Sequence, residues 1–157
     1  MPGTGSCFCG HVKYRYTGDV QAKALCHCLD CRKISGSTYS TNLIVPGEGF
    51  EVVQGTPKEI SKTADDSKNA ITSYFCPDCG STLFRKGATF GDAVIVKAGT
   101  LDDHSSLESH KPELELYAGH RPSWVGKVGS SAQKKGMPDS EDHEVSTTDK
   151  IKAKLGA

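Results

Sequence analysis

Seven cysteines gathered in three short segments are the feature that most constrains the fold of this 157-residue chain. They are Cys7, Cys9, Cys26, Cys28, Cys31, Cys76 and Cys79. An odd number of cysteines, spaced by one or two residues, argues against a disulfide framework and favours metal binding. The first residues lack the basic and apolar regions of a signal peptide, so we expect a cytoplasmic protein with reduced thiols. Zinc is the metal that such thiolate clusters usually hold.

Composition narrows the class of protein further. Hydrophobic residues make up 36% of the chain, which is lean for one packed domain, so metal sites would supplement the core. Nineteen basic residues balance nineteen acidic ones, and this zero net charge offers no long-range attraction to nucleic acid or anionic lipid. No apolar run approaches the roughly 20 residues that span a bilayer. We therefore expect neither a membrane nor a nucleic-acid partner.

The hydrophobic pattern predicts a mainly β fold. Residues 11–17 alternate strictly and place Val12, Tyr14 and Tyr16 on one face of a half-buried strand. Further β-rich runs, separated by Gly, Pro, Asp and Asn, are typical of antiparallel sheets. These runs cover residues 39–45, 50–54, 58–62, 71–75, 83–85, 93–98 and 114–117. One short helix is expected over residues 28–35.

The end of the chain differs in composition from the rest. Every aromatic residue and every cysteine lies at or before Trp124. We therefore expect one domain over residues 1–125, followed by a flexible and irregular C-terminal tail over residues 126–157. Because the tail has few apolar groups, its removal is expected to leave the stability nearly unchanged.

Two segments each supply half of a tetrahedral zinc site: Cys-Phe-Cys-Gly at residues 7–10 and Cys-Pro-Asp-Cys-Gly at residues 76–80. In the second segment the two-residue spacer lets both sulfurs face one ion, and the final glycine permits a turn with positive φ. Four thiolates complete a closed, structural site that joins distant segments and contributes folding energy. The alternative is that these cysteines are reduced and merely packed in the core.

The remaining segment, Cys-His-Cys-Leu-Asp-Cys at residues 26–31, has three cysteines and no fourth to complete a tetrahedron. A zinc ion with three protein ligands keeps one position for water or substrate, which distinguishes catalytic from structural sites. Cys26, Cys28 and Cys31 are therefore the candidate catalytic residues.

A histidine could close this cluster and make it an ordinary structural site. On spacing alone the candidates are His27, His104, His110 and His120. His27 is a poor one, because it lies between two ligands in an extended segment and should point away from the sulfurs.

Charge indicates what would occupy an open position. Zinc with three thiolates carries a formal negative charge and activates water poorly, whereas a thiol would bind as a soft thiolate. Arg32 and Lys33 directly follow the cluster and would offset the added charge. A small cytosolic thiol is the natural substrate candidate.

Four motifs together resemble a known family. They are Gly5-Ser-Cys-x-Cys-Gly-x-Val-x-Tyr14, Cys26-His-Cys-x-x-Cys-Arg-Lys-x-x-Gly-Ser37, Phe75-Cys-x-x-Cys-Gly-Ser81 and Arg121-Pro-Ser-Trp124. Over residues 5–125 the chain resembles the glutathione-dependent formaldehyde-activating family, which is related to centromere protein V. This resemblance implies an Mss4-like fold of antiparallel sheets built around two zinc ions, one structural and one catalytic.

The resemblance also implies a function. The family's reaction adds the co-substrate glutathione to formaldehyde to give S-(hydroxymethyl)glutathione, and its members are classed as carbon–sulfur lyases for the reverse direction. Carried over by motif, the structural zinc would be held by Cys7, Cys9, Cys76 and Cys79, and the catalytic zinc by Cys26, Cys28 and Cys31. Apart from the motif, Arg121 is a candidate for binding a glutathione carboxylate, although most arginines are simply solvated. Trp124 is a candidate for walling the thiol pocket, although a lone tryptophan at the end of a domain more often plugs the core.

Two other interpretations are open at the level of sequence. One is a non-catalytic two-zinc binding module resembling centromere protein V. The other is a lyase or isomerase for a larger thioether or carbonyl compound, because a fold determines the site more firmly than the substrate. The sequence leaves the oligomeric state undetermined.

Overall fold

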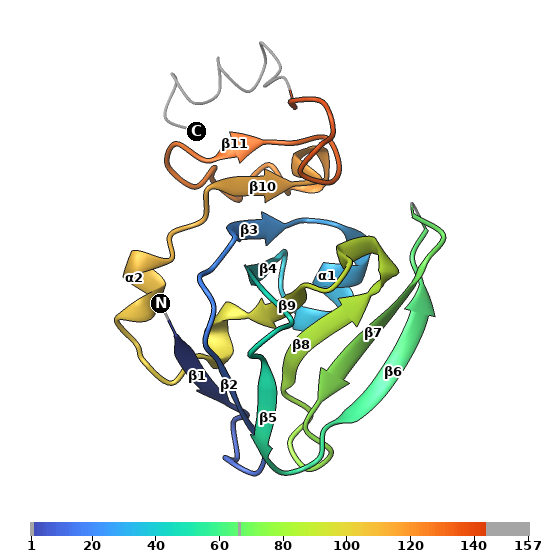
Figure 1. Cartoon of the computed structure of the whole chain (residues 1–157). Helices are drawn as coiled ribbons and strands as arrows, with labels where there is room; N and C mark the ends of the chain where they lie inside the picture. The colour runs from blue at the N-terminus through green and yellow to red at the C-terminus, as the bar shows by residue number, and fades with distance from the viewer. Residues whose placement is uncertain (1, 66, 144–157) are drawn as a thin grey trace.

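The computed structural model describes residues 2–65 and 67–143, which form two β-sheets with short helical turns (Figure 1). The smaller sheet is antiparallel and has the order β1 (Gly3–Ser6), β2 (Lys13–Tyr16), β5 (Glu51–Gln54). The larger sheet has the order β11-β10-β3-β4-β9-β8-β7-β6. Its strands are β3 (Ala22–Cys26), β4 (Ser40–Val45), β6 (Lys58–Thr63), β7 (Ala70–Phe75), β8 (Thr82–Gly87), β9 (Val94–Lys97), β10 (Leu114–Leu116) and β11 (Ala132–Gln133).

The helical elements are short. They are α1 (Leu29–Ser35), α2 (Ser106–Ser109) and the 3-10 turns η1 (Ala88–Phe90), η2 (Ala98–Thr100) and η3 (Ala118–His120). Helix α1 begins after Cys28, whose sulfur accepts from the Cys31 amide, and ends at Gly36 in the left-handed conformation that favours glycine. No helix among the described residues is long and apolar enough to cross a membrane.

The mainly β prediction is confirmed, and each predicted strand is present within two residues of its expected ends. The sheets are not wholly antiparallel, because β10 runs parallel to both β3 and β11. The chain reaches β10 from β9 through η2 and α2, and a connection of this length can return a strand in the parallel direction.

Strand β1 was not predicted, because its sequence Gly-Thr-Gly-Ser has low β-propensity. The structure gives these glycines a packing role. A Cβ atom on Gly3 would overlap the Tyr16 ring, and one on Gly5 would overlap the Tyr14 hydroxyl. Strand β1 can therefore pair closely with β2 only because Gly3 and Gly5 have no side chains.

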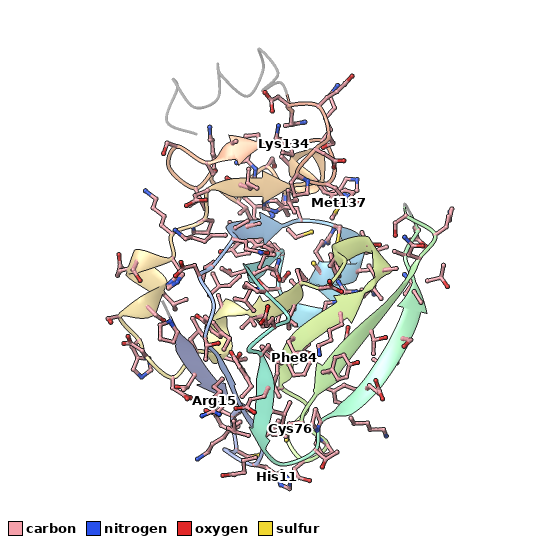
Figure 2. All side chains as sticks on the ribbon, viewed as in Figure 1. His11, Arg15, Cys76, Phe84, Lys134 and Met137 are labelled. Atoms are coloured by element: carbon pink, nitrogen blue, oxygen red, sulfur yellow. The ribbon has the colours of Figure 1, made fainter. Side chains whose placement is uncertain are left out.

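The segment assigned to a flexible tail contributes to the larger sheet. Strand β11 pairs with β10, and the Lys134 amide donates to the Glu115 carbonyl at 2.8 Å. Lys134 lies at the opposite end of the molecule from His11 and Cys76 (Figure 2). The ordered structure thus continues past the domain boundary expected near residue 125. It does so through backbone and polar contacts, which a count of apolar residues cannot detect. Residues 144–157 lie outside the described residues.

The pleat of β4 and β9 separates two environments. On one face Leu43 and Val96 belong to the main apolar core, which also contains Tyr14 from the smaller sheet. The opposite face carries Asn42 and Lys97, which lie directly opposite each other across the strand pair. This polar face leads to the second cysteine cluster.

Candidate metal centres and the adjoining pocket

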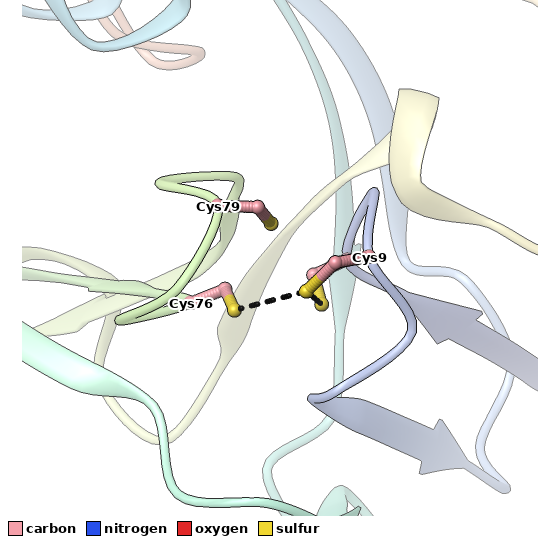
Figure 3. A group of neighbouring side chains, drawn as sticks. Cys9, Cys76 and Cys79 are labelled. Atoms are coloured by element: carbon pink, nitrogen blue, oxygen red, sulfur yellow. Dashed lines mark hydrogen bonds between the residues drawn. The ribbon is translucent and has the colours of Figure 1, made fainter.

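The four-cysteine cluster forms where two turns meet (Figure 3). Cys7 and Cys9 lie in the turn between β1 and β2, and Cys76 and Cys79 lie between β7 and β8. The sulfur of Cys9 lies 3.6 Å from that of Cys7 and 3.7 Å from that of Cys76. A tetrahedral zinc site with bonds of about 2.3 Å has sulfur–sulfur edges of about 3.8 Å, so the donor set fits zinc.

Backbone and side-chain donors surround these sulfurs. The Val12 amide donates to the Cys7 sulfur at 3.2 Å. The Ser81 hydroxyl lies 3.3 Å from the Cys79 sulfur, and hydrogen bonding from Ser81 is the main cause that lowers the pKa of Cys79 to about 5. Cys7 and Cys76 are buried in the main core. The four-cysteine cluster is thus built into the contact between the two sheets.

The three-cysteine cluster forms at the junction of β3 and α1. Cys26 ends β3, Cys28 caps α1, and Cys31 lies in the first turn of that helix. Their sulfurs lie within 4.8 Å of one another, and no histidine or carboxylate atom from the described residues joins them. Cys26 and Cys31 are buried, whereas Cys28 is partly exposed. The donor set fits zinc with one tetrahedral position left to a ligand from outside the described residues.

The histidines do not close this cluster. His27 is fully buried and its Nε2 lies 2.9 Å from a carboxylate oxygen of Glu115, so the side chain points away from the sulfurs as predicted. His110 contacts the Ser106 carbonyl through Nδ1 at 2.6 Å. None of the described histidines supplies a fourth ligand atom.

Glu115 is the centre of a buried polar network behind the cluster. It accepts hydrogen bonds from the Ser131 hydroxyl at 2.7 Å and from the Val128 amide at 2.8 Å, in addition to the His27 contact. Burial opposes ionisation of Glu115, but these hydrogen bonds outweigh it and lower the pKa of the carboxyl. The Arg121 Nε lies 3.7 Å from the same carboxylate. Sequence reasoning missed Glu115, because His27, Arg121 and Ser131 are not its neighbours in the sequence.

A pocket of about 440 Å³ lies near the three-cysteine cluster, although no cysteine is among its lining residues. Ser40 and Lys97 line one part of it, and Gly80 and Ser81 line another. Ser40 lies directly opposite Cys26 in the register of β3 and β4. A second pocket of about 400 Å³ shares Ser81 with the first and extends toward the four-cysteine cluster at Cys7.

Lys97 is the basic residue of this pocket, and sequence reasoning missed it. Its ammonium donates to the Asn42 amide oxygen at 2.7 Å and to the Ser40 hydroxyl at 3.3 Å. Burial lowers the pKa of Lys97, while the thiolate of Cys31 opposes this shift. One feature of the sequence could have indicated a buried lysine. Lys97 ends the apolar run Val-Ile-Val, and because it follows Ile95 by two residues it lies on the same face of the strand as Ile95.

The three sulfurs lie close enough to shift one another's pKa values. Contacts from Cys26 and then Cys28 lower the pKa of Cys31, with a further contribution from the charge of Lys97. The contacts with Cys28 and Cys31 raise the pKa of Cys26. A cation beside the sulfurs would favour the ionised form of all three.

The residues predicted to bind the thiol substrate lie elsewhere. Arg32 and Lys33 are exposed. They follow the buried Cys31 in α1, and because each residue of a helix is rotated by about 100° from the one before, both side chains point away from the cluster. Arg121 donates to the Gln133 amide oxygen at 2.9 Å instead of reaching the pocket. Trp124 is 78% exposed, so it neither plugs the core nor lines the pocket. Lys97 is the basic residue in the lining of this pocket, and the predicted substrate-binding residues are not in that lining.

Comparison with known proteins agrees with this architecture. Residues 2–120 match a family model described as glutathione-dependent formaldehyde-activating enzyme. A Penicillium rubens protein, whose name provisionally assigns it to these enzymes, is 32% identical over 92 residues, which cover 53% of this chain and 47% of that protein. The match thus spans about half the length of this curated relative.

A solved structure extends the likeness to the fold. It is a Rhodobacter sphaeroides protein with a TM-score of 0.51 and 17% identity, covering 66% of this chain and 94% of that one. At this identity the likeness concerns the fold alone. Because the family model covers most of the sequence, the chain belongs to the glutathione-dependent formaldehyde-activating enzyme family.

Proposed function

We propose that this protein is a zinc-dependent carbon–sulfur lyase that joins glutathione, or a similar thiol, to formaldehyde or a similar carbonyl compound and also releases them. The contrast between the two cysteine clusters carries the proposal. Four sulfurs complete one donor set, whereas Cys26, Cys28 and Cys31 leave one position for a ligand from outside. Membership of the family supports a thiol and an aldehyde as the substrates.

Cys26, Cys28 and Cys31 would hold the zinc ion, which when bound would supply a Lewis acid that lowers the pKa of an incoming thiol. The protein chain fixes the positions of the sulfur ligands. Cys26 at the end of β3 and Cys31 in the first turn of α1 are buried and fixed by the elements that carry them. Ligands fixed in this way would hold a bound thiolate in one orientation, so that more of its encounters with the carbonyl compound would be productive.

The reaction balances without an oxidant or a reductant. The thiolate sulfur attacks the carbonyl carbon and forms one carbon–sulfur bond. The carbonyl π bond breaks, and its oxygen takes up a proton equivalent to the one that the thiol lost. The product is a hemithioacetal, and the reverse reaction returns the thiol and the aldehyde.

The pocket beside the cluster suits a polar, peptide-like thiol. Its lining includes the hydroxyl-bearing residues Ser35, Ser37, Tyr39 and Thr41. Hydroxyl groups both donate and accept hydrogen bonds, as the amides and carboxylates of such a substrate require. The volume of about 440 Å³ provides room for a ligand longer than the thiol group alone.

Exchange spectroscopy tests this function. In a mixture of ¹³C-formaldehyde and glutathione at equilibrium, the zinc-loaded protein should accelerate exchange between free and thiol-bound formaldehyde. Cys28→Ser should return the exchange to the rate without protein, whereas Lys86→Met, at an exposed position on β8, should behave as wild type. Equal exchange rates with wild type, with Cys28→Ser and without protein would support a binding module instead.

A further inference from the structure

Two cations are buried on the face of the larger sheet that carries Cys26, and among the described residues neither has a carboxylate partner. Lys97 is 8% exposed and Arg85 is 5% exposed. Arg85 donates to the Ser73 hydroxyl at 3.2 Å, and Lys97 donates only to Ser40 and Asn42. No carboxylate of the described residues lies within 4.0 Å of either cation. A buried charge requires compensation, so the counter-charge must come from another group.

Strand register shows where that group lies. Arg85 is opposite Ile95, and Lys97 follows Ile95 by two residues, so both cations project from the same face of the sheet. On the neighbouring strands Lys97 is opposite Asn42, and Ser40 is opposite Cys26. The hydrogen bond from Lys97 to Ser40 connects these two positions. The cysteine sulfurs are therefore the negative groups nearest to the ammonium of Lys97 on this face.

A count of formal charges then indicates what the cluster accepts. A divalent ion with three thiolates carries one negative charge. Behind the cluster the buried Glu115 carboxylate is offset by Arg121, whose Nε lies 3.7 Å from it. Lys97 and Arg85 then leave an excess of one positive charge. One further anion makes the buried site neutral, whereas a neutral ligand leaves an excess positive charge away from water. Burial makes such an imbalance costly.

We propose that Lys97, with Arg85 behind it, makes the open position of the three-cysteine cluster selective for an anionic ligand over a neutral one. This inference rests on the proposed function, because it requires a divalent ion at that cluster. Lys97 lines the pocket, and its ammonium is held by Asn42 and by Ser40, the residue opposite Cys26. In the proposed reaction the anion is the thiolate, and imidazole is the neutral competitor.

Cobalt provides a readout that does not depend on activity. In the full-length protein loaded with Co²⁺, visible absorption reports the ligands of the ion, and the part of the spectrum lost in Cys28→Ser belongs to the three-cysteine cluster. Titration with 2-mercaptoethanol and with imidazole gives two dissociation constants, whose ratio measures selectivity. We expect wild type to favour the thiol. Lys97→Met should reduce this preference by about tenfold or more, because a desolvated charge pair is lost.

Two further variants separate the charge of Lys97 from the size of its side chain. Lys97→Arg keeps the charge and should retain most of the preference for the thiol. Lys86→Met removes a lysine from the strand that carries Arg85, but on the opposite face, and should leave the ratio unchanged.

The outcomes distinguish the inferred selectivity for anions from the proposed function. A Lys97→Met ratio equal to that of Lys86→Met would overturn the inference and leave the proposed function standing. If Lys97→Met does not fold, wild type alone decides, because equal affinity for the thiol and imidazole would also overturn the inference. A cobalt spectrum with no part that depends on Cys28 would instead contradict the metal site of the proposed function.

Discussion

At the residue scale, Glu115 connects the second cysteine cluster to the C-terminal part of the described chain. Its carboxylate is fully buried and contacts His27 beside the cluster and Ser131 in the later segment. Hydrogen bonds to a charged group contribute more than bonds between neutral groups, about 1.5–3 kcal/mol each. Loss of this carboxylate should therefore loosen the segment that carries Cys26 and Cys28.

Glu115→Gln is predicted to destabilise the protein in a pH-dependent way. Because the folded pKa of Glu115 lies below its ordinary value of 4.5, its ionisation stabilises the fold fully above that value and loses effect as the pH falls through the folded pKa. We expect the variant to lower the free energy of unfolding by about 2–4 kcal/mol at pH 7, and by less at an acidic pH below 4.5. Urea unfolding at both pH values measures the difference.

Glu108→Gln is the matched control for this experiment, since Glu108 is an exposed acidic residue in α2. It should change the unfolding free energy by less than about 0.5 kcal/mol at either pH. A Glu115→Gln effect that keeps its size at acidic pH would contradict the stabilising role of the ionised carboxylate.

At the scale of elements, strand β10 links the described C-terminal segment to the strand that carries Cys26. Leu116 lies opposite Cys26 in the parallel pair with β3, and Leu114 lies opposite Ala132 in the pair with β11. The His27 amide also donates to the Leu116 carbonyl at 3.0 Å. Strand β11 therefore supports the three-cysteine cluster through one intervening strand.

Truncation tests this support. A chain that ends at residue 129 lacks Ser131 and β11, whereas a chain that ends at residue 143 keeps both. We expect the shorter chain to melt at least about 5 °C below the longer one, because it loses hydrogen bonds worth about 2 kcal/mol. Calorimetry of the two zinc-loaded chains measures this. Equal midpoints would restore the expectation that the tail contributes nothing.

At the scale of the whole molecule, the four-cysteine cluster joins segments far apart in the sequence. The turn that carries Cys7 and Cys9 belongs to the smaller sheet, and the turn that carries Cys76 and Cys79 belongs to the larger one. The three-cysteine cluster instead closes a segment of only six residues. A metal that links distant segments restrains the unfolded chain more, so the two clusters should differ in their effect on stability.

Matched serine substitutions measure that difference. Cys79→Ser is expected to lower the melting temperature by about 10 °C or more, because it removes a ligand from the site that joins the sheets. Cys28→Ser should cost less than about 4 °C, because Cys28 is partly exposed and closes a short loop, yet it should abolish thiol-dependent exchange. Equal losses of stability in the two variants would contradict the division of roles.

The cysteine clusters and most strands were predictable, because spacing and alternation are local signals. The spacing of Cys76 and Cys79 is by itself typical of a metal-binding turn. The alternation of Val12, Tyr14 and Tyr16 likewise indicates a strand without information from other segments. Lys97 and Glu115 were not predicted, because their roles depend on which strands pair and in what register. Their partners Asn42 and Ser131 come from other segments, which the sequence does not align.

The central claim is that one zinc ion has a complete set of protein sulfurs and the other has an open position for a thiolate. X-ray absorption at the zinc edge, on protein with two zinc ions, measures the mean number of sulfur ligands per ion. Four sulfurs at one cluster and three at the other predict a mean of about 3.5 without thiol. Saturating glutathione should raise it to about 4.0. A mean number of sulfur ligands that glutathione leaves unchanged would contradict an open position for a thiolate at the three-cysteine cluster.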